Sequence, residues 1–470
     1  MKPTIFAKEN QPPLSREAED PRKVKRAATA AVLGTSLEYY EFNIYGSAAA
    51  LVFGKIFFPT SNAFIGTMLA LSSFAIVYVV RPIAAAVLGH FGDRIGRKKL
   101  LMFTLFLMGS STFLIGCLPT YEMVGMWAPV LLVSLRVLQG ISAAGEQAGS
   151  SALTLEHAPP GRRGFFASFT PAGTAGGFLA ATAVFALVAT LPDDALMSWG
   201  WRIPFWASLI LLAGTFFARR FLAESEVFTA AKEETTKQQS PVIQMFRNHP
   251  GRLFRVFLMA LFSILFQVPP LFALAFATSD AVGVPKTTML WISVVSYAVA
   301  FSLYPFMGNL SDRIGRKPVF IAGTFGAGLL IFPFFVAITS GNVLFILLCS
   351  LALNGVAGVA ANAIYPSMFA EAFPVGLRFT GIALGLQLGT AISGFMPTVG
   401  WWLVGEGGTD WMPVAVIVFV FCTLASVACA VGRETYRTPT EQLGLDTVAD
   451  ESDKVTVPSA PAAPETTGRR

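Results

Sequence analysis

Residues 89–98 read Gly-His-Phe-Gly-Asp-Arg-Ile-Gly-Arg-Lys, and residues 308–317 read Gly-Asn-Leu-Ser-Asp-Arg-Ile-Gly-Arg-Lys. The two segments share their last six residues and begin 219 positions apart in a chain of 470 residues. A chance repeat of this length is improbable. The pattern therefore indicates a chain built from two similar halves.

A second, looser echo supports the repeat. It consists of an acid, a proline and an arginine at offsets of 214 or 215 residues: Glu156, Pro160 and Arg163, then Glu371, Pro374 and Arg378. Parallel halves with a binding site between them near the bilayer midplane are a known architecture for transport by alternating access.

The composition is that of a membrane protein. Hydrophobic residues make up 54% of the chain and charged residues only 13%, about half the roughly 25% of an ordinary soluble domain. At about 20 apolar residues per crossing, the chain can supply about a dozen transmembrane helices. The net charge of +6 is scattered between apolar runs, so it does not predict a nucleic-acid partner.

Twelve apolar stretches divide six and six around a polar segment. They lie at 27–53, 62–90, 100–118, 127–155, 164–191 and 203–222, and at 253–279, 287–309, 318–339, 342–370, 379–404 and 411–432. We therefore predict an all-α integral membrane protein of 12 transmembrane helices in two six-helix halves, 27–222 and 253–432.

The distribution of basic residues predicts the orientation. Alternating loops place only Lys55, Arg202 and Lys286 on one side, and Arg81 and Arg136 fall within helices; the other 29 of the 34 basic residues share the opposite side. By the positive-inside rule that side is the cytoplasm. Both termini are thus expected to be cytoplasmic.

Three polar segments complete the predicted organisation. Residues 1–26 form a cytoplasmic N-terminal segment, 223–252 a cytoplasmic linker, and 433–470 a cytoplasmic tail. The tail is rich in Thr, Pro, Ala and acids, so it cannot bury a core and is expected to be disordered.

The repeated loop resembles the signature of the major facilitator superfamily of secondary transporters. Further segments are similar to its metabolite:proton symporter family: Glu38 to Phe42 with Tyr45-Gly46, Arg81-Pro82, Arg136 to Gly140, and Gly145-Glu146. The resemblance covers residues 27–435. It implies proton-driven uptake of small polar metabolites such as shikimate, 2-oxoglutarate, citrate, proline or betaine, by a multi-pass inner-membrane protein.

Two carboxylates in the first helix are candidates for proton coupling. Glu38, Glu41 and Tyr45 fall within a 60° arc of the helix. A charge inside a bilayer is costly, and repulsion between neighbouring carboxylates favours proton binding by one of them. The alternative is that one of them simply hydrogen-bonds a neighbouring helix, or that Glu41 lies near the outer water.

Helix four carries the polar residues Arg136, Gln139 and Glu146 within about 80° of arc. The planar guanidinium of Arg136 can hold a carboxylate by two hydrogen bonds, so we expect it to bind an organic acid, with Gln139 beside it and Glu146 as a third coupling acid. The alternative is an internal ion pair of Arg136 with one of the glutamates.

Weaker candidates for substrate binding lie elsewhere. Arg81, near the end of helix two, is placed either to bind substrate or to extend toward the headgroups. In the second half, polar residues within helices can hydrogen-bond a substrate or can simply join helices: Gln267, Tyr297, Asn354 and Gln387, and also Tyr304, Asn362 and Tyr365. Helix breakers at Pro171 with Gly173, Gly176 and Gly177, and at Pro269-Pro270, are expected to permit bending.

The repeated loops are expected to form a cytoplasmic gate. Asp93 and Asp312 can accept hydrogen bonds from a facing helix N-terminus, and the glycines permit close approach. By the resemblance, these loops latch the halves together. The predicted gate comprises Gly89, Asp93, Arg94, Gly96, Arg97, Gly308, Asp312, Arg313, Gly315 and Arg316.

Other function classes find little support. We see no metal-ligand set, nucleophile pair or cofactor loop, so we predict no enzyme, no metal and no cofactor besides the coupling proton. We expect a monomer that works in the lipid bilayer. An exporter, antiporter or uniporter remains the alternative within transport, and a receptor or membrane-embedded enzyme is a remote one.

Overall fold

The computed structural model describes residues 21–95, 97–143, 161–220, 241–374, 377–439 and 443–444. Within these ranges, the side chains of residues 21–28, 30, 31, 85–101, 218–220 and 241 are not described. Helices are the only regular secondary structure in the described chain, as the apolar runs of membrane length predict.

Each half contributes six spanning segments. The first half has α1 (Pro21–Ala48), α3 (Ala63–Ile95), α4 (Arg97–Gly116), α6 (Trp127–Ser142), α8 and α9 (Arg163–Ala167 and Phe169–Val188) and α11 (Ile203–Arg220). The second has α14 to α15 (Pro250–Ala277), α16 (Lys286–Ile314), α17 (Arg316–Ser340), α18 to α20 (Val343–Glu371), α21 and α22 (Arg378–Gly394 and Met396–Val404) and α23 (Met412–Val431).

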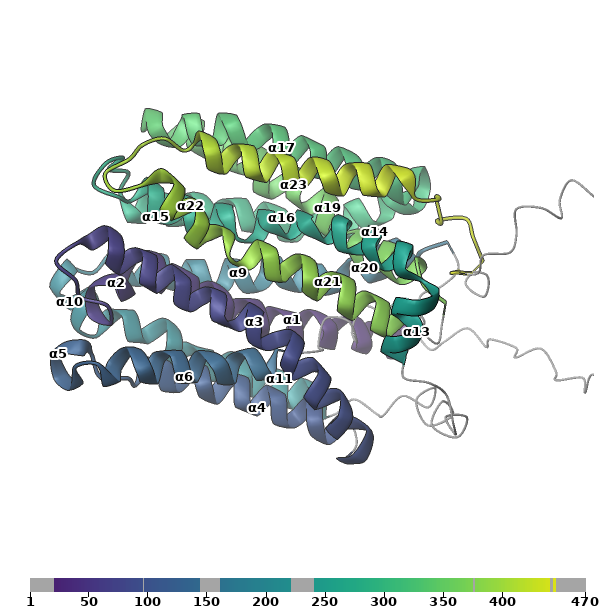
Figure 1. Cartoon of the computed structure of the whole chain (residues 1–470), viewed down its shortest axis with the longest axis horizontal. Helices are drawn as coiled ribbons and strands as arrows, with labels where there is room; N and C mark the ends of the chain where they lie inside the picture. The colour runs from purple at the N-terminus through teal and green to yellow at the C-terminus, as the bar shows by residue number, and fades with distance from the viewer. Residues whose placement is uncertain are drawn as a thin grey trace, which may run out of the picture.

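Nine of the described helices are long and apolar enough to cross a membrane, and α1 with the shorter apolar helices in α4 and α6 brings the set to twelve. The halves lie side by side, the first in purple to blue and the second in green to yellow (Figure 1). We call the end that carries Asp312 and Arg316 the latch end. The opposite end, which carries α5 (Tyr121–Val124) and α10 (Asp193–Ser198), is the far end.

Close packing of α1 on α9 depends on glycine. A Cβ at Gly177 would lie 2.5 Å from the carbonyl oxygen of Ser36, and one at Gly173 would lie 2.6 Å from that of Val32. Small residues let membrane helices approach in this way. The structure thus gives these glycines a packing role, and α9 runs unbroken through them from Phe169 to Val188.

The predicted break at Pro269-Pro270 is present. The segment passes from α14 into a 3-10 turn, Leu261–Phe266, and then into a π turn, Val268–Phe272, with Gln267 at the junction. Proline lacks an N–H and cannot continue the regular hydrogen-bond ladder. Irregular backbone at membrane depth is tolerated when protein surrounds it, and Pro269 and Pro270 are both buried.

Three expected segments need comment. Helix four, expected over 127–155, is described as α6 over Trp127–Ser142, and the expected remainder from 144 to 155 lies outside the described residues. The predicted linker contains helix α13 (Pro241–Asn248), whose Met245 is fully buried. The expectation of disorder from 433 onward is wrong for 433–439, because hydrogen bonds described below fix this segment at the latch end.

Replacing Gly177 with Ala tests the α1–α9 contact. The new Cβ must displace the α1 backbone, and overpacking of this kind costs about 1–3 kcal/mol. We expect a lower apparent melting temperature of the purified protein in detergent. Gly214→Ala is the control, because a Cβ there meets nothing within 4 Å and alanine favours a helix. Equal melting of both variants would contradict the packing role.

Candidate functional site

Glu38 of α1 and Arg81 of α3 form a buried ion pair. Arg81 Nη2 donates to Glu38 Oε1 at 2.7 Å, and the side chains are 5% and 1% exposed. The guanidinium lies 4.3 Å from the ring centre of Phe42 and 5.5 Å from that of Tyr78. Arg81 therefore points into the bundle, and the alternative that it extends to the headgroups is wrong.

Glu41 is joined to Arg136 by a chain of three hydrogen bonds. Thr112 Oγ1 donates to Glu41 Oε2 at 2.6 Å, and Gln139 Nε2 donates to Thr112 Oγ1 at 2.6 Å. Arg136 Nη1 then donates to Gln139 Oε1 at 2.8 Å. The expected alignment of Arg136 with Gln139 on α6 is present, and their shared face meets α1 and α4.

Arg136 is enclosed by aromatic rings. Its guanidinium lies 3.9 Å from the ring centre of Tyr45, 4.9 Å from that of Phe74 and 5.2 Å from that of Phe42. The Tyr45 hydroxyl bonds the Ser73 hydroxyl at 2.7 Å, and Arg136 itself is 0% exposed. A substrate can reach Arg136 only if these rings move.

One hydrogen bond joins the halves near the middle of the bundle. Gln267 Nε2, at the α14 to α15 break, donates to the Tyr78 hydroxyl at 2.7 Å. Tyr78 packs so closely on α21 that a Cβ at Gly394 would lie 2.3 Å from its ring. The Glu38–Arg81 pair thus contacts the second half through Tyr78.

A small cavity lies between α9 and the second half. Its volume is about 20 Å³, room for about one water molecule. The rings of Phe178 and Tyr297 lie 5.2 Å apart beside it. Its polar or aromatic lining residues are Phe178, Phe266, Tyr297, Tyr304 and Asn354.

Of the second-half candidates, Tyr297 and Asn354 line this cavity, Gln267 contacts Tyr78, and Gln387 is half-buried on α21 away from the lining. Tyr304, another of the predicted second-half residues, also lines the cavity and accepts a hydrogen bond from Asn362. The sequence does not show which of these polar residues line a cavity and which only join helices.

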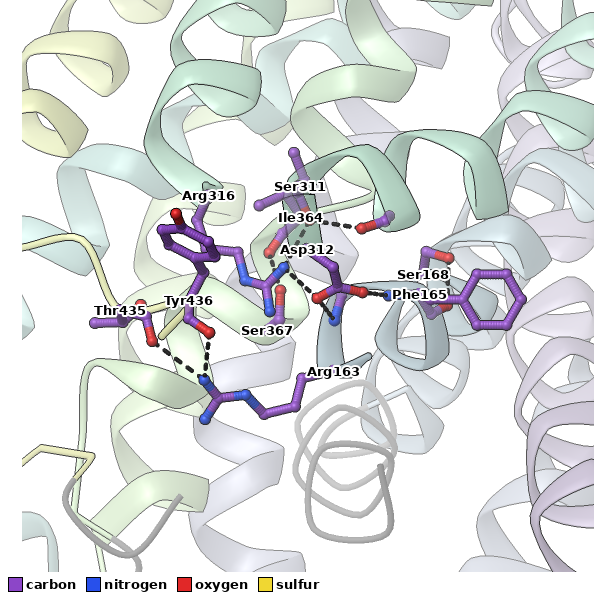
Figure 2. Close-up of polar contacts among 12 residues, drawn as sticks. Arg163, Phe165, Ser168, Ser311, Asp312, Arg316, Ile364, Ser367, Thr435 and Tyr436 are labelled. Atoms are coloured by element: carbon purple, nitrogen blue, oxygen red, sulfur yellow. Dashed lines mark hydrogen bonds and ion pairs between the residues drawn. The ribbon is translucent and has the colours of Figure 1, made fainter. Parts of the chain in front are cut away.

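The second copy of the repeated loop holds the two halves together (Figure 2). Asp312 accepts hydrogen bonds from the backbone N–H groups of Gly164 and Phe165 at 2.9 and 2.8 Å. These are first-turn donors of α8, as predicted for this aspartate. A Cβ at Gly308 would lie 2.6 Å from the Gly164 carbonyl oxygen, so this contact requires glycine.

An ion-pair network extends the contact. Arg316 binds Asp312 at 2.7 Å and Glu371 at 3.4 Å, and Glu371 also binds Arg163 of the first half at 3.3 Å. Arg313, in contrast, is exposed, and Gly315 adopts a φ of 107°, which glycine tolerates far better than other residues. Arg163 and Glu371 both belong to the second, looser repeat of an acid, a proline and an arginine. That repeat is the sequence signal from which their position at the latch end could have been predicted.

The segment after α23 completes this network. Glu434 accepts hydrogen bonds from the backbone N–H groups of Arg316 and Lys317, both at 3.0 Å, and so caps α17. Arg163 Nη2 donates to the carbonyl oxygens of Thr435 and Tyr436 at 3.1 and 3.2 Å (Figure 2). Nothing in the composition of the tail predicted this role.

Several predicted residues lie beyond what is described. Gly96 and Glu146 fall outside the described residues, and for Gly89, Asp93, Arg94 and Arg97 only the helical backbone is described. Their predicted roles in the gate and in coupling stay predictions.

The halves also meet at the far end. Trp401 Nε1 of α22 donates to the Phe64 carbonyl oxygen at 3.1 Å, and the two rings stack 5.7 Å apart. Lys286 forms an ion pair with Asp193 of α10, and the hydrogen bond and charge of Lys286 lower the pKa of Asp193. Among the described residues, the halves are thus in contact at both ends of the bundle, and the small cavity lies between these contacts.

Comparisons with known proteins agree with this architecture. Residues 27–252 match the family described as Sugar (and other) transporter, and residues 256–459 match the Major Facilitator Superfamily. The solved structure of the proton:xylose symporter XylE bound to 6-bromo-6-deoxy-D-glucose covers 90% of this chain and 98% of its own at a TM-score of 0.66 and 17% identity. That likeness shows the fold.

Two curated relatives are similar over most of the chain. The Shikimate transporter of Escherichia coli (strain K12) is 33% identical over 420 residues, 88% of this chain and 96% of the relative. The Inner membrane metabolite transport protein YhjE of the same strain is 34% identical, over 87% and 94%. The chain belongs to the major facilitator superfamily, within its metabolite:proton symporter family. It is thus a multi-pass inner-membrane transporter and not an enzyme.

Asp312→Asn tests the latch-end contact. The variant removes the charge that binds Arg316 and weakens two hydrogen bonds to α8, so we expect the latch end to open more often. The measurement is the alkylation rate of Ser168→Cys, buried beside Gly308, in a background in which the four native cysteines are replaced. Asp280→Asn, an exposed far-end residue, is the control. An unchanged rate would contradict a latch function.

Proposed function

We propose that this protein is a proton-coupled symporter that imports a small polar metabolite, with an organic acid favoured, by alternating access. The observation that carries the proposal is the buried Glu38–Arg81 ion pair at the centre of the first half. The relationship to a shikimate transporter, whose named substrate is a carboxylic acid, supports the same substrate class. The latch end faces the cytoplasm, and a single chain is the working unit.

A buried ion pair of this kind couples a proton to an anion. With Glu38 ionised, Arg81 is neutralised and the region is closed to a second anion. Protonation of Glu38 removes its charge and leaves the Arg81 guanidinium, which then attracts a substrate carboxylate. Proton and anion therefore enter together, because each alone leaves an uncompensated charge in a medium of low polarity.

The hydrogen-bond chain that begins at Glu41 gives the proposed mechanism a second way to couple a proton to the substrate. Glu41 is connected to Arg136 through Thr112 and Gln139, so a change in its protonation alters the hydrogen bonds that position Arg136. Because Tyr45 and Phe74 hold the same guanidinium, movement of Arg136 is linked to movement of the rings. In this mechanism, Arg136 contacts the substrate when the transporter is open. Glu41 sets the position of the Arg136 guanidinium through Thr112 and Gln139.

The substrate occupies the space between α9 and the second half. Gln267 Oε1 is buried and accepts no hydrogen bond from the described residues, so it is available to a hydroxyl or ammonium group. Tyr297 and Asn354 line the cavity, and so does Phe266, the residue before Gln267. A volume of about 20 Å³ must expand to admit a metabolite, which requires separation of the halves at one end.

The positions of exposed charges support the orientation. Among the described residues, exposed arginine side chains lie on α13 and beside the latch-end termini of α8, α16 and α23: Arg162, Arg247, Arg313, Arg433 and Arg437. The acids described there, Asp312, Glu371 and Glu434, belong to the latch network. An excess of arginine favours the cytoplasmic side.

Glu38→Gln and Glu41→Gln test proton coupling. A glutamine cannot carry the proton, so we expect at least one variant to lose gradient-driven accumulation in proteoliposomes while it retains exchange of internal for external substrate. Wild-type accumulation by both single variants and by their double would refute coupling through these groups. Retained exchange of internal for external substrate serves as the control, because it shows that a variant is folded and inserted in the membrane.

Arg136→Lys tests the requirement for a planar guanidinium. An ammonium cannot bond Gln139 and the Phe74 carbonyl while it stacks on Tyr45, and a desolvated cation–π contact contributes about 2 kcal/mol. We expect transport to fall by about tenfold or more. Full activity of Arg136→Lys would show that a point charge suffices.

The substrate itself is found by reconstitution. Purified protein in liposomes is offered shikimate, 2-oxoglutarate, citrate, proline or betaine, and charge movement and internal pH are recorded with and without a proton gradient. Uptake stimulated by an inward proton gradient supports the symporter. Uptake that the gradient leaves unchanged indicates a uniporter, and uptake driven by an outward gradient indicates an antiporter.

A further inference from the structure

Helix α13 (Pro241–Asn248), between the two halves, has an exposed apolar face. Val242, Ile243 and Phe246 are 43%, 58% and 54% exposed, whereas Met245 is fully buried against the second half. At 100° per residue the three exposed residues fall within a 100° arc, and Met245 projects to one side of it. The exposed face is therefore distinct from the packing face.

The surroundings of α13 are those of a membrane boundary. It packs on α14 and α21 at the latch end (Figure 1). On these two spanning helices Phe254 and Phe379 are 60% and 47% exposed, within the first turns after the latch end. The apolar face of α13 thus lies where the lipid-facing surface of the second half ends.

The charges beside this face are basic. Arg247 is exposed and lies about 40° beyond Ile243 around the helix. The other exposed charged side chains described at this end are also arginines, while its described acids are engaged in the latch network. An apolar face with a basic rim matches an anionic membrane surface.

We propose that α13 is an interfacial membrane helix that binds anionic phospholipid. It lies in the headgroup layer with Val242, Ile243 and Phe246 among the upper acyl chains, and Arg247 contacts lipid phosphate. This goes beyond transport itself: the connection between the halves is held at the membrane surface by a lipid-dependent contact. A protein docked on the same face is the competing occupant.

Continuity with the lipid-facing surface favours lipid over a protein. A short helix whose neighbours already face acyl chains reaches the headgroup layer without any rearrangement of the chain. Arg252, one turn into α14, donates to the carbonyl oxygen of Ala372, the residue after Glu371 of the latch network. Helix α13 ends at Asn248, two residues before the start of α14 at Pro250. The lipid-bound helix is therefore next in sequence to the helix whose Arg252 contacts the latch network.

Spin labels on the full-length protein test the position of α13. In a background in which Cys117, Cys349, Cys422 and Cys429 are replaced, Phe246→Cys is labelled with a nitroxide and the protein is reconstituted in phosphatidylcholine vesicles with and without phosphatidylglycerol. Asn248→Cys, two residues on and about 200° around the helix, is the matched control. Power saturation compares collision with oxygen, which partitions into lipid, and with a water-soluble nickel complex.

We expect the label at 246 to collide more with oxygen and the label at 248 more with nickel. Phosphatidylglycerol should increase the oxygen preference at 246, and Arg247→Gln should remove that increase. A label at 246 that nickel reaches as readily as at 248, in both lipid mixtures, would overturn the proposal. Shielding from both reagents, with spin–spin broadening that vanishes on dilution with unlabelled protein, would assign the face to a second copy of the chain instead.

Discussion

The cost of a charge inside a bilayer constrains the whole first half of this protein. Glu38, Glu41, Arg81 and Arg136 are all buried within the bundle, where an ionised group without compensation is strongly unfavourable. Breaking a buried ion pair by removing one partner costs about 3–5 kcal/mol. The surrounding helices must therefore supply partners, and they do so with Thr112, Gln139 and the aromatic rings around Arg136.

This constraint also explains why proton and substrate are tied together in the proposed mechanism. When Glu38 is ionised, its charge compensates that of Arg81. When Glu38 is protonated, the positive charge of Arg81 is uncompensated, and an anionic substrate restores neutrality. The Tyr78–Gln267 hydrogen bond places that cluster in contact with the irregular part of the second half. In the proposed mechanism, a change of charge in one half thus acts directly on the irregular α14 to α15 segment of the other.

The two ends of the bundle are closed by different chemistry. The latch end uses a network of buried charges, helix N–H groups and glycines, in which Asp312, Arg316, Glu371 and Arg163 take part. The far end uses a stacked Phe64–Trp401 pair and one largely exposed ion pair. Exposed pairs contribute little to stability, so the Phe64–Trp401 contact is the more important of these two at the far end.

The fold class and much of the site followed from sequence, because each rests on a local rule. Apolar runs of membrane length predicted the twelve helices, helical periodicity placed Arg136 with Gln139, and the repeat predicted an aspartate that accepts from a helix N-terminus. The partners of those residues did not follow. Thr112, Ser73 and Tyr78 are ordinary members of apolar runs, and only packing shows that they bind Glu41, Tyr45 and Gln267.

The sequence by itself determined the membrane class, the duplicated halves and the polar residues available for coupling, because hydropathy, repetition and charge are properties of the chain. Tertiary structure alone decided that Arg81 pairs with Glu38, that Arg136 is shut behind aromatic rings, and that Glu434 joins the latch. These contacts join residues 43, 62 and more than 100 positions apart. The free energy of these contacts depends on how several helices pack and exclude water around them. The sequence of any one helix does not determine that packing.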